Sequence, residues 1–147
     1  MKISLFISML LVAGSLFARN LDKTFQLLPQ PQSIEVLNGK GLNYGDLSYV
    51  VSAGEAPIPV LGAITDGLPQ SEQAGKGVHF QLSQTNVPDS PEGYVLEITN
   101  KGVTITSRSE AGLFYGCQTL EQLLEDSRDF KKEIPPMKIT DYPAIAY

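Results

Sequence analysis

The stretch EGYVLEITNKGVTITSRSEAGLFYGCQTLEQLLED, residues 92–126, decides the fold, because it holds the clearest strand, turn and helix signals of the chain. Apolar residues occupy every second position over 94–98, which is typical of a strand with one buried face. A tight turn at Asn100-Lys101-Gly102 follows, and Val103 and Ile105 continue with the same period of two. These residues predict two antiparallel strands that lead into a helix.

The helix of this stretch has both a start signal and an apolar face. Ser107 and Glu110 have the spacing of a capping box, and Ser109 is an alternative cap. The apolar face is predicted to hold Leu113, Phe114, Cys117, Leu120 and Leu124, and the water-facing side Gln118, Glu121, Gln122 and Glu125. Each large side chain on that face contributes about 1.5–3 kcal/mol if it is fully buried, so we expect this helix to be a main anchor of the core.

Upstream of this stretch the chain alternates between strand and helix patterns. LLPQPQ, residues 27–32, is an extended lead-in, and SIEVLNGKGLNY, residues 33–44, predicts a hairpin that turns at Asn38-Gly39. LSYVVS, residues 47–52, predicts a third strand. Apolar residues three and four apart between Pro59 and Leu68 predict a first helix.

Two more strands complete the predicted order. VHFQL, residues 78–82, alternates Val78, Phe80 and Leu82 inward and leaves His79 on the opposite face, and MKIT, residues 137–140, predicts a short strand. The hairpins are too short for parallel crossovers. The sequence therefore predicts an α+β fold with a mixed or antiparallel sheet and two helices packed on one face.

The first 18 residues are excluded from this fold, because Lys2 followed by ISLFISMLLVAGSLFA is typical of a secretory signal peptide. The apolar run of about 15 residues is short for a membrane span, which needs about 20. Cleavage after Ala18 or near Ala13-Gly14-Ser15 is compatible with the small residues present. We therefore expect an exported protein, periplasmic or extracellular, with no membrane association after cleavage.

The remaining chain is one domain in size and acidic in charge. Removing residues 1–18 from the 147 leaves 129, enough for one domain that buries roughly two thirds of its unfolded surface. Without Lys2, 10 basic residues stand against 16 acidic ones, a net charge of −6 with no basic block. This charge disfavours nucleic-acid binding. A single cysteine excludes an internal disulfide, so burial of apolar residues must hold the domain together.

The residues that could carry chemistry are few and scattered. One histidine, His79, and one cysteine, Cys117, cannot assemble a zinc site of the usual kind, and no serine has a nucleophile motif around it. Cys117 lies on the apolar face of a helix, as a small core residue does. Glu125 and Asp126 are adjacent and point apart on a helix, and Asp141 is interpreted as a turn or cap residue.

A glycine-rich stretch also needs an interpretation. GKGLNYG, residues 39–45, differs from a dinucleotide-binding loop in its last spacing, and a strand rather than a helix follows it. Without tryptophan, a platform for stacking sugars is not favoured. We therefore predict no catalytic, cofactor-binding or metal-binding residue in this chain, and no cofactor.

Three blocks of the chain resemble one known family. LLPQPQSIE at 27–35, the stretch at 92–124 and ITDYPAIAY at 139–147 are similar to the N-terminal domain of the β-N-acetylhexosaminidases, family 20 of the glycoside hydrolases. The tail resembles the family pattern D-x-P-R-F-A-Y-R-G, with Ala144 where arginine is common. The resemblance implies residues 19–136 as the N-terminal domain and 137–147 as the start of a linker or first strand of a catalytic (β/α)8 barrel.

The resemblance also implies how the whole enzyme would work. In the family, the barrel hydrolyses terminal N-acetylhexosamines with retention: the acetamido oxygen of the substrate attacks, and a paired Asp and Glu assist. No position of this chain matches that pair. We therefore expect a non-catalytic domain, a truncated or split product, whose partner is a catalytic barrel in cis or in trans. A free-standing glycan- or protein-binding module, an accessory subunit, and the leading domain of another glycoside hydrolase are the alternatives.

Overall fold

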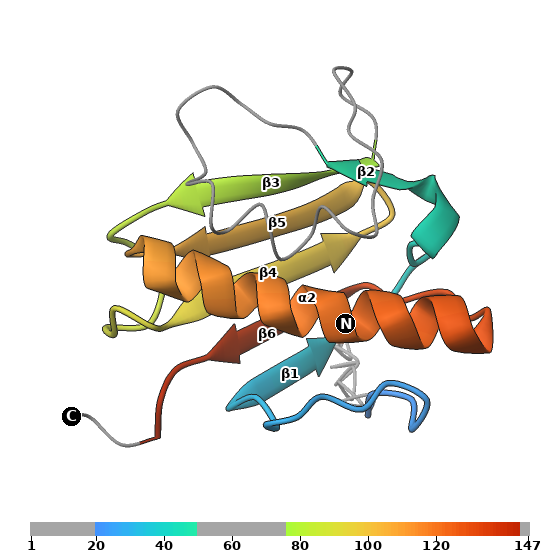
Figure 1. Ribbon diagram of the computed structural model, residues 1–147, viewed down its shortest axis with the longest axis horizontal. Coiled ribbons are helices and arrows are strands. Elements are labelled where there is room, and N and C mark those ends of the chain that lie inside the picture. The colour runs from blue at the N-terminus through green and yellow to red at the C-terminus, as the bar shows by residue number, and fades with distance from the viewer. Residues whose placement is uncertain (1–19, 50–75, 145–147) are drawn as a thin grey trace, which may run out of the picture.

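The computed structural model describes residues 20–49 and 76–144, which form one open sheet covered on one face by a helix (Figure 1). The sheet order is β1-β6-β4-β5-β3-β2. The elements are β1 Ser33–Val36, a 3-10 turn Tyr44–Asp46, β2 Leu47–Tyr49, β3 Lys76–Leu82, β4 Tyr94–Thr99, β5 Gly102–Ser107, α2 Glu110–Phe130 and β6 Met137–Asp141.

The sheet is mixed, which confirms the predicted fold class. β4 pairs antiparallel with β5 and with β6, and β1 pairs antiparallel with β6. β3 lies parallel to β5, and β2 lies parallel to β3. The helix predicted between Pro59 and Leu68, the signal peptide at 1–18 and the last three residues of the tail lie outside the described residues.

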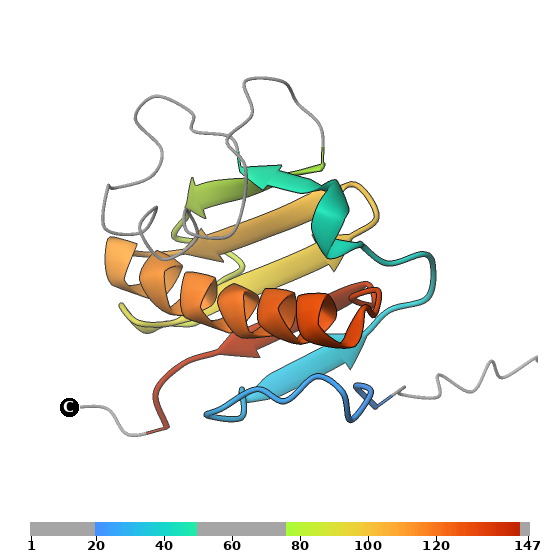
Figure 2. The same ribbon diagram turned by 45° about the vertical axis from the view of Figure 1, so that its right-hand side comes forward.

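α2 covers one face of the sheet (Figure 2), and the hydrophobic core lies between the two. Alternate residues of β4 point to the helix and are buried: Tyr94, Leu96 and Ile98. The facing side of α2 is fully buried at Leu113, Cys117, Leu120 and Leu123. The predicted inward residues of β4 are therefore confirmed, because a strand with one covered face buries every second side chain.

Two glycines let α2 approach the sheet closely. A Cβ added at Gly112 would overlap the side chain of Ser107 and the carbonyl of Gly93, and one at Gly116 would lie 2.5 Å from Cγ2 of Ile105. The glycines of AGLFYG are thus required by the packing of the helix on β4 and β5. We call the strip of α2 residues that faces the core the seam. Because the helix lies so close to the sheet at these glycines, the seam is narrow.

The helix start and its apolar face differ in part from the prediction. Ser109, the alternative cap, occupies the N-cap, where its Oγ accepts from the amide of Gly112 at 3.4 Å. Ser107 is not the cap, because its Oγ donates to the carbonyl of Gly93 at 2.6 Å. The prediction that Phe114 is a core residue is wrong, because Phe114 lies to the side of the narrow seam and is 39% exposed. Leu123 takes a core position that the prediction omitted.

The predicted hairpin at 33–44 is wrong. β1 pairs with β6, with Ile34 opposite Ile139, and Leu42 forms an isolated bridge with Ile134. Both sides of the expected hairpin therefore pair with the segment that follows α2, which lies far away in sequence. The chain still bends at Asn38-Gly39, where Gly39 has a φ of 129° that favours glycine.

The strand at 78–82 is confirmed, with one side chain placed differently. Val78 and Phe80 are buried and His79 is exposed on the opposite face. Leu82 is 52% exposed rather than inward, because it is the last residue of β3 and stands beside the small Ser107 at the end of the sheet. Of the third predicted strand, 47–52, residues 47–49 form β2 and the rest lies outside the described residues.

The strand predicted at 137–140 is confirmed as β6, and it lies inside the sheet between β1 and β4. Residues 137–141, expected as the start of a linker or barrel strand, are thus part of this sheet. Asp141 ends β6, and the chain then runs away from the sheet toward the C-terminus (Figure 1).

Candidate functional site

The candidate catalytic residues lie apart in the fold. His79 is on the sheet face away from α2, opposite Thr104 of β5, and Cys117 is buried between α2 and the other face. Neither lies where the other could assist it. Across residues 20–49 and 76–144, no three His, Cys, Asp or Glu side chains gather to hold a metal ion. The absence of catalytic, cofactor and metal residues in the whole chain stays a prediction.

The environment of Cys117 is that of a core residue. Burial, and then the charge of Glu121, raise the pKa of its thiol to about 12. The nucleophilic thiolate is therefore a negligible fraction at neutral pH.

We expect the thiol of Cys117 to react with a disulfide reagent at pH 8 at least about a hundredfold more slowly in the folded chain than in urea. The chain has one cysteine, so the released chromophore reports this site alone. Equal rates with and without urea would contradict the burial.

The two adjacent acidic residues near the end of α2, Glu125 and Asp126, have different surroundings. Oδ2 of Asp126 accepts from the amide of Gln26 at 2.9 Å, and Glu125 is exposed. One turn earlier, Oε1 of Gln122 accepts from the amide of Leu28 at 2.8 Å. These bonds hold the lead-in alongside α2, so Gln122, which was predicted to face water, serves as an anchor.

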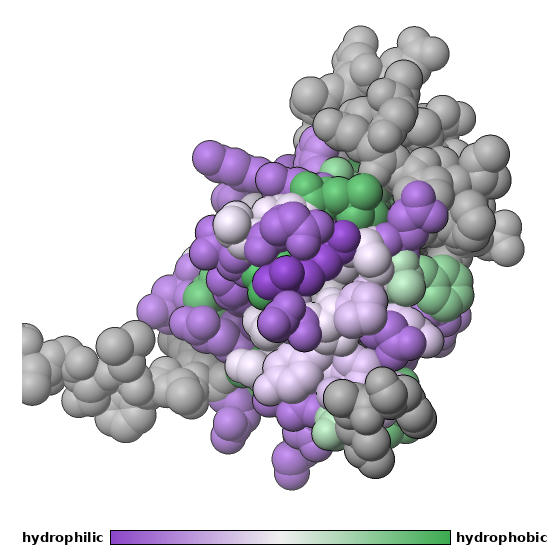
Figure 3. Space-filling view, turned by 90° about the vertical axis from the view of Figure 1, so that its left-hand side faces the viewer, coloured by the Kyte–Doolittle hydropathy of each residue, from purple (hydrophilic) through white to green (hydrophobic). Residues whose placement is uncertain are grey.

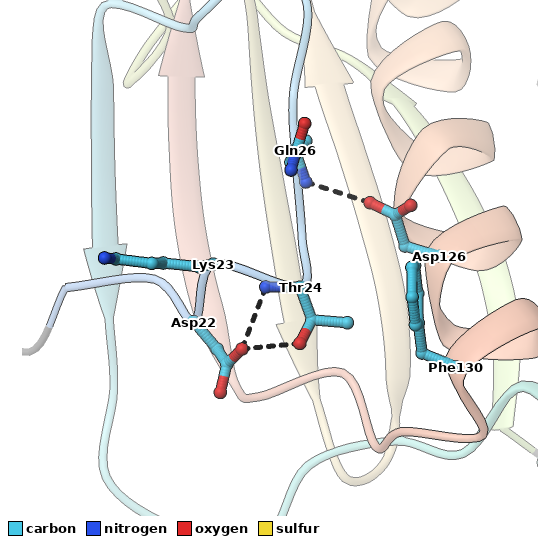
Figure 4. A pocket seen from close by; sticks show the side chains of 6 residues that line it. All are labelled: Asp22, Lys23, Thr24, Gln26, Asp126 and Phe130. Carbon is cyan, nitrogen blue, oxygen red and sulfur yellow. Dashed lines mark hydrogen bonds between the residues drawn. The ribbon is translucent and has the colours of Figure 1, made fainter.

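A shallow depression of about 500 Å³ lies between residues 22–26, which precede the lead-in, and the end of α2 (Figure 4). Its lining residues are Asp22, Lys23, Thr24, Gln26, Asp126 and Phe130. Asp22 accepts from Thr24 and Lys132, the latter at 2.7 Å, and Lys132 together with Thr24 holds the pKa of this carboxyl well below its usual range. The carboxylate stays ionised and paired, so it fastens residues 22–24 to Lys132 and does not suit acid–base work.

Replacing Lys132 with Met is expected to return the pKa of Asp22 towards the ordinary value of about 3.9. Because the folded pKa is lowered, the pair stabilises the fold above the unfolded pKa, and this contribution is lost as pH falls through the folded pKa. An NMR titration of the Asp22 carboxyl carbon measures the change. Lys101→Met, on an exposed turn, is the matched control and should leave it unchanged. An Asp22 titration that is identical in Lys132→Met and in the wild type would contradict the pairing.

The glycine-rich stretch has a structural role. The amide of Gly41 donates to Oε1 of Glu133 at 2.7 Å, and a Cβ at this position would overlap the carbonyl of Ile134. The glycine allows the loop to approach the segment after α2. The absence of a phosphate-binding role for this stretch stays a prediction from its spacing.

Asp141 joins four parts of the domain at the end of β6. Its Oδ1 accepts from the amide of Gln32 at 3.1 Å, and its Oδ2 accepts from the hydroxyl of Tyr94 at 3.4 Å. The hydroxyl of Tyr94 also lies 2.5 Å from Oγ1 of Thr119 on α2. Burial raises the pKa of Tyr94, and the charge of Asp141 raises it further, so the phenol remains a proton donor.

This junction fixes the direction in which the chain leaves the sheet. The side-chain amide of Gln32 donates to the carbonyl of Tyr142 at 3.4 Å, which ties the first residue after β6 to the lead-in. Sequence reasoning gave Asp141 a local turn or cap role and missed its partners, because they lie 47 and 109 residues away. A small polar residue, Thr119, among the leucines of α2 was the available signal.

The face of the sheet away from α2 is polar. One row across it reads Glu35, Lys138, Glu97, Thr104 and His79, in register on neighbouring strands. Nζ of Lys138 lies 3.3 Å from Oε1 of Glu97. Among the strand residues that the structure describes on this face, none is a large exposed hydrophobic.

Among the described residues, no helix has both the length and the apolar character needed to cross a membrane.

The described residues define an α+β domain: a mixed sheet, one covering helix, and polar side chains that hold segments together. The model of one protein family, Glycosyl hydrolase family 20, domain 2, matches residues 24–142. The chain therefore belongs to this family, the N-terminal non-catalytic domain of the family 20 hydrolases, as the resemblance implied.

Known proteins agree with this assignment. A β-hexosaminidase of Porphyromonas gingivalis is 27% identical over 143 residues, covering 86% of this chain and 18% of that protein. The solved N-acetyl-β-hexosaminidase of Streptomyces plicatus is 26% identical with a TM-score of 0.59, covering 87% of this chain and 28% of that one. The structure of CpGH84D has a TM-score of 0.65 at 14% identity, covers 82% of this chain and 24% of that one, and shows the fold alone. In homologues, this domain is the partner of a catalytic barrel domain.

Proposed function

We propose that this chain serves as the non-catalytic N-terminal domain of an exported β-N-acetylhexosaminidase. The observation that carries the proposal is the family match over residues 24–142, together with a relative that is named a β-hexosaminidase. The chain spans 18% of that relative's length, so the proposal assigns hydrolysis of terminal N-acetylhexosamine residues to the barrel and structural support to this domain.

The arrangement of polar groups supports a structural role. Three carboxylates each hold a segment in place: Asp22 pairs with Lys132 just after α2, Asp126 of α2 accepts from the amide of Gln26, and Asp141 accepts from the amide of Gln32. Most glycosidases use a pair of carboxyl groups that flank the scissile glycosidic bond. Asp22 and Asp126 line the same depression, but both already accept hydrogen bonds from the chain.

The purified chain tests this proposal directly. On a chromogenic N-acetylglucosaminide it should show no turnover above a buffer blank, whereas the β-hexosaminidase of Porphyromonas gingivalis in the same assay serves as the positive control. Turnover that copurifies with the chain and is lost on Asp22→Asn or Asp126→Asn would overturn the assignment of the chemistry to another domain.

Export is a separate part of the proposal and rests on residues 1–18. Expression of the whole chain in a bacterium should yield a periplasmic protein shortened by the signal peptide, with cleavage after Ala18 or near Ser15. Intact mass measurement decides this. A cytoplasmic product of full mass would contradict export and leave the domain assignment intact.

A further inference from the structure

Asn38 is the one asparagine of this chain that is followed by glycine. The residues after the five asparagines are Leu21, Gly39, Tyr44, Val87 and Lys101. The side-chain carbonyl carbon of an asparagine can reach the backbone nitrogen of the next residue, and a side chain on that next residue hinders the approach. Glycine has no side chain and lets other groups come close to its backbone. Asn38 therefore has the least hindered backbone nitrogen beside it.

The structure places Asn38 and Gly39 in an exposed bend. Both residues follow β1, and the loop after β1 stands out from the body of the domain (Figure 2). A Cβ built on Gly39 would meet nothing within 4 Å. Among the residues that the structure describes, none forms a hydrogen bond with the side chain of Asn38 or with the amide of Gly39. Water can therefore reach both groups.

The loop that contains this pair is attached at its two ends. The amide of Leu37 donates to the carbonyl of Pro136 at 2.8 Å, and Leu42 exchanges two backbone hydrogen bonds with Ile134, each of 2.9 Å. Between these attachments, residues 38–40 are all exposed. Exposed loop backbone with few contacts is the part of a fold that opens most easily. The loop can thus change conformation locally while both attachments stay in place.

We propose that Asn38-Gly39 is a site of spontaneous covalent modification, at which the asparagine deamidates through a cyclic succinimide to aspartate and isoaspartate. Asparagine is one of the thermolabile residues of proteins. Water is the only co-reactant, so the reaction needs neither an enzyme nor a cofactor. The inference is independent of the proposed function, because it depends only on the loop after β1.

The reaction has two steps. In the first, the amide nitrogen of Gly39 gives its proton to hydroxide and attacks Cγ of Asn38. The bond between this nitrogen and Cγ forms, the bond between Cγ and Nδ2 breaks, and Nδ2 takes a proton from water and leaves as ammonia. In the second step, water opens the five-membered ring at one of its two carbonyl carbons. One water replaces one ammonia, and no atom is oxidised or reduced.

The carbonyl carbon that water attacks decides the product. Attack at Cγ breaks the new bond and gives aspartate with the original main chain. Attack at the backbone carbonyl carbon gives isoaspartate, whose main chain runs through Cβ and Cγ and is one atom longer. Both products carry a new carboxylate beside Lys40. Because Leu37 and Leu42 are attached to the segment after α2, residues 38–40 must accommodate the longer main chain.

Incubation of the purified chain in mildly alkaline buffer, followed by trypsin digestion and peptide mass measurement, tests the proposal. Trypsin releases Asn38 in the peptide 24–40, and it releases Asn86 and Asn100 together in the peptide 77–101. Fragmentation of the second peptide separates its two asparagines. An unincubated sample gives the starting amount of each product.

Two asparagines of the same chain are matched controls. Asn100 is exposed in a tight turn, as Asn38 is exposed in a bend, but Lys101 follows it. Asn86 is exposed in the loop between β3 and β4 and precedes Val87. This loop lies at the end of the domain that faces the viewer in Figure 3, where many hydrophilic side chains meet the solvent. Both controls therefore differ from Asn38 in the residue that follows and not in access to water.

The expected result is that the peptide 24–40 gains one mass unit and divides into two products that separate by chromatography. This reaction should be at least about tenfold faster than that of Asn86 or Asn100, since glycine leaves its backbone nitrogen unhindered. Asn38→Asp supplies the reference for the aspartate product. Asn38→Gln should lose the mass gain, because glutamine would have to close a larger ring. Equal rates at Asn38 and Asn100, or a mass gain that persists in Asn38→Gln, would overturn the proposal.

The same incubation in urea tests whether the folded loop leaves the site open. We expect Asn38 in the folded chain to react within about tenfold of its rate in urea, because loops with few contacts open easily. A folded chain that reacts more slowly than this would show that the fold protects the site, and would overturn the proposal for the native protein.

Discussion

Replacing Gly112 with alanine is expected to lower the free energy of unfolding by about 2 kcal/mol, although alanine is the better helix former. The new methyl group would overlap the side chain of Ser107 and the carbonyl of Gly93. Ser107 cannot turn away cheaply, because its Oγ donates to Gly93 and accepts from the amide of Ser109. Overpacking costs about 1–3 kcal/mol and occasionally more, against a gain of about 1 kcal/mol in helix propensity.

Urea denaturation of Gly112→Ala measures this loss. Gly45→Ala is the matched control, because a Cβ at Gly45 meets nothing within 4 Å. The control should be as stable as wild type or slightly more stable, since alanine restricts the unfolded chain. A Gly112→Ala variant as stable as the control would show that α2 does not pack on β4 and β5 as closely as described.

Truncating Leu120 to alanine is expected to cost about 3 kcal/mol, the largest effect we predict. Leu120 is fully buried between α2 and the sheet, and Leu to Ala changes in cores cost about 2–5 kcal/mol through lost burial and the cavity left behind. Domains of this size are stable by about 5–15 kcal/mol in total. We therefore expect the melting temperature to fall by about 10 °C.

Leu82→Ala is the control for this truncation, because it makes the same chemical change at a residue that is 52% exposed. It should cost less than about 1 kcal/mol. Equal losses for the two variants would contradict the assignment of Leu120 to the core and Leu82 to the surface.

Local patterns predicted the centre of this fold well. The period-two alternation of β4 and β5 and the apolar seam of α2 depend on residues close in sequence, so they could be predicted without the structure. The errors also have a local cause. Phe114 has the right polarity for the seam, but Gly112 and Gly116 narrow that seam by drawing the helix onto the sheet.

Pairing between distant segments could not be predicted in the same way. The chain does bend at Gly39, yet β1 pairs with β6. The alternation of apolar residues in a strand does not show which other strand lies beside it. The same holds for the anchors of the candidate site. Gln122 and Asp141 look like solvent-facing and turn residues until their partners, Leu28 and Gln32, are brought beside them by the fold.

Our central proposal is that this domain supports a catalytic barrel and leaves the chemistry to it. The most direct measurement is turnover of a chromogenic N-acetylglucosaminide by three proteins: the isolated chain, the Porphyromonas gingivalis relative without its matched region, and the fusion of the two. We predict no turnover by the chain, little by the shortened relative, and restored turnover by the fusion. Turnover by the isolated chain, or full activity of the shortened relative with no gain in the fusion, would contradict the claim.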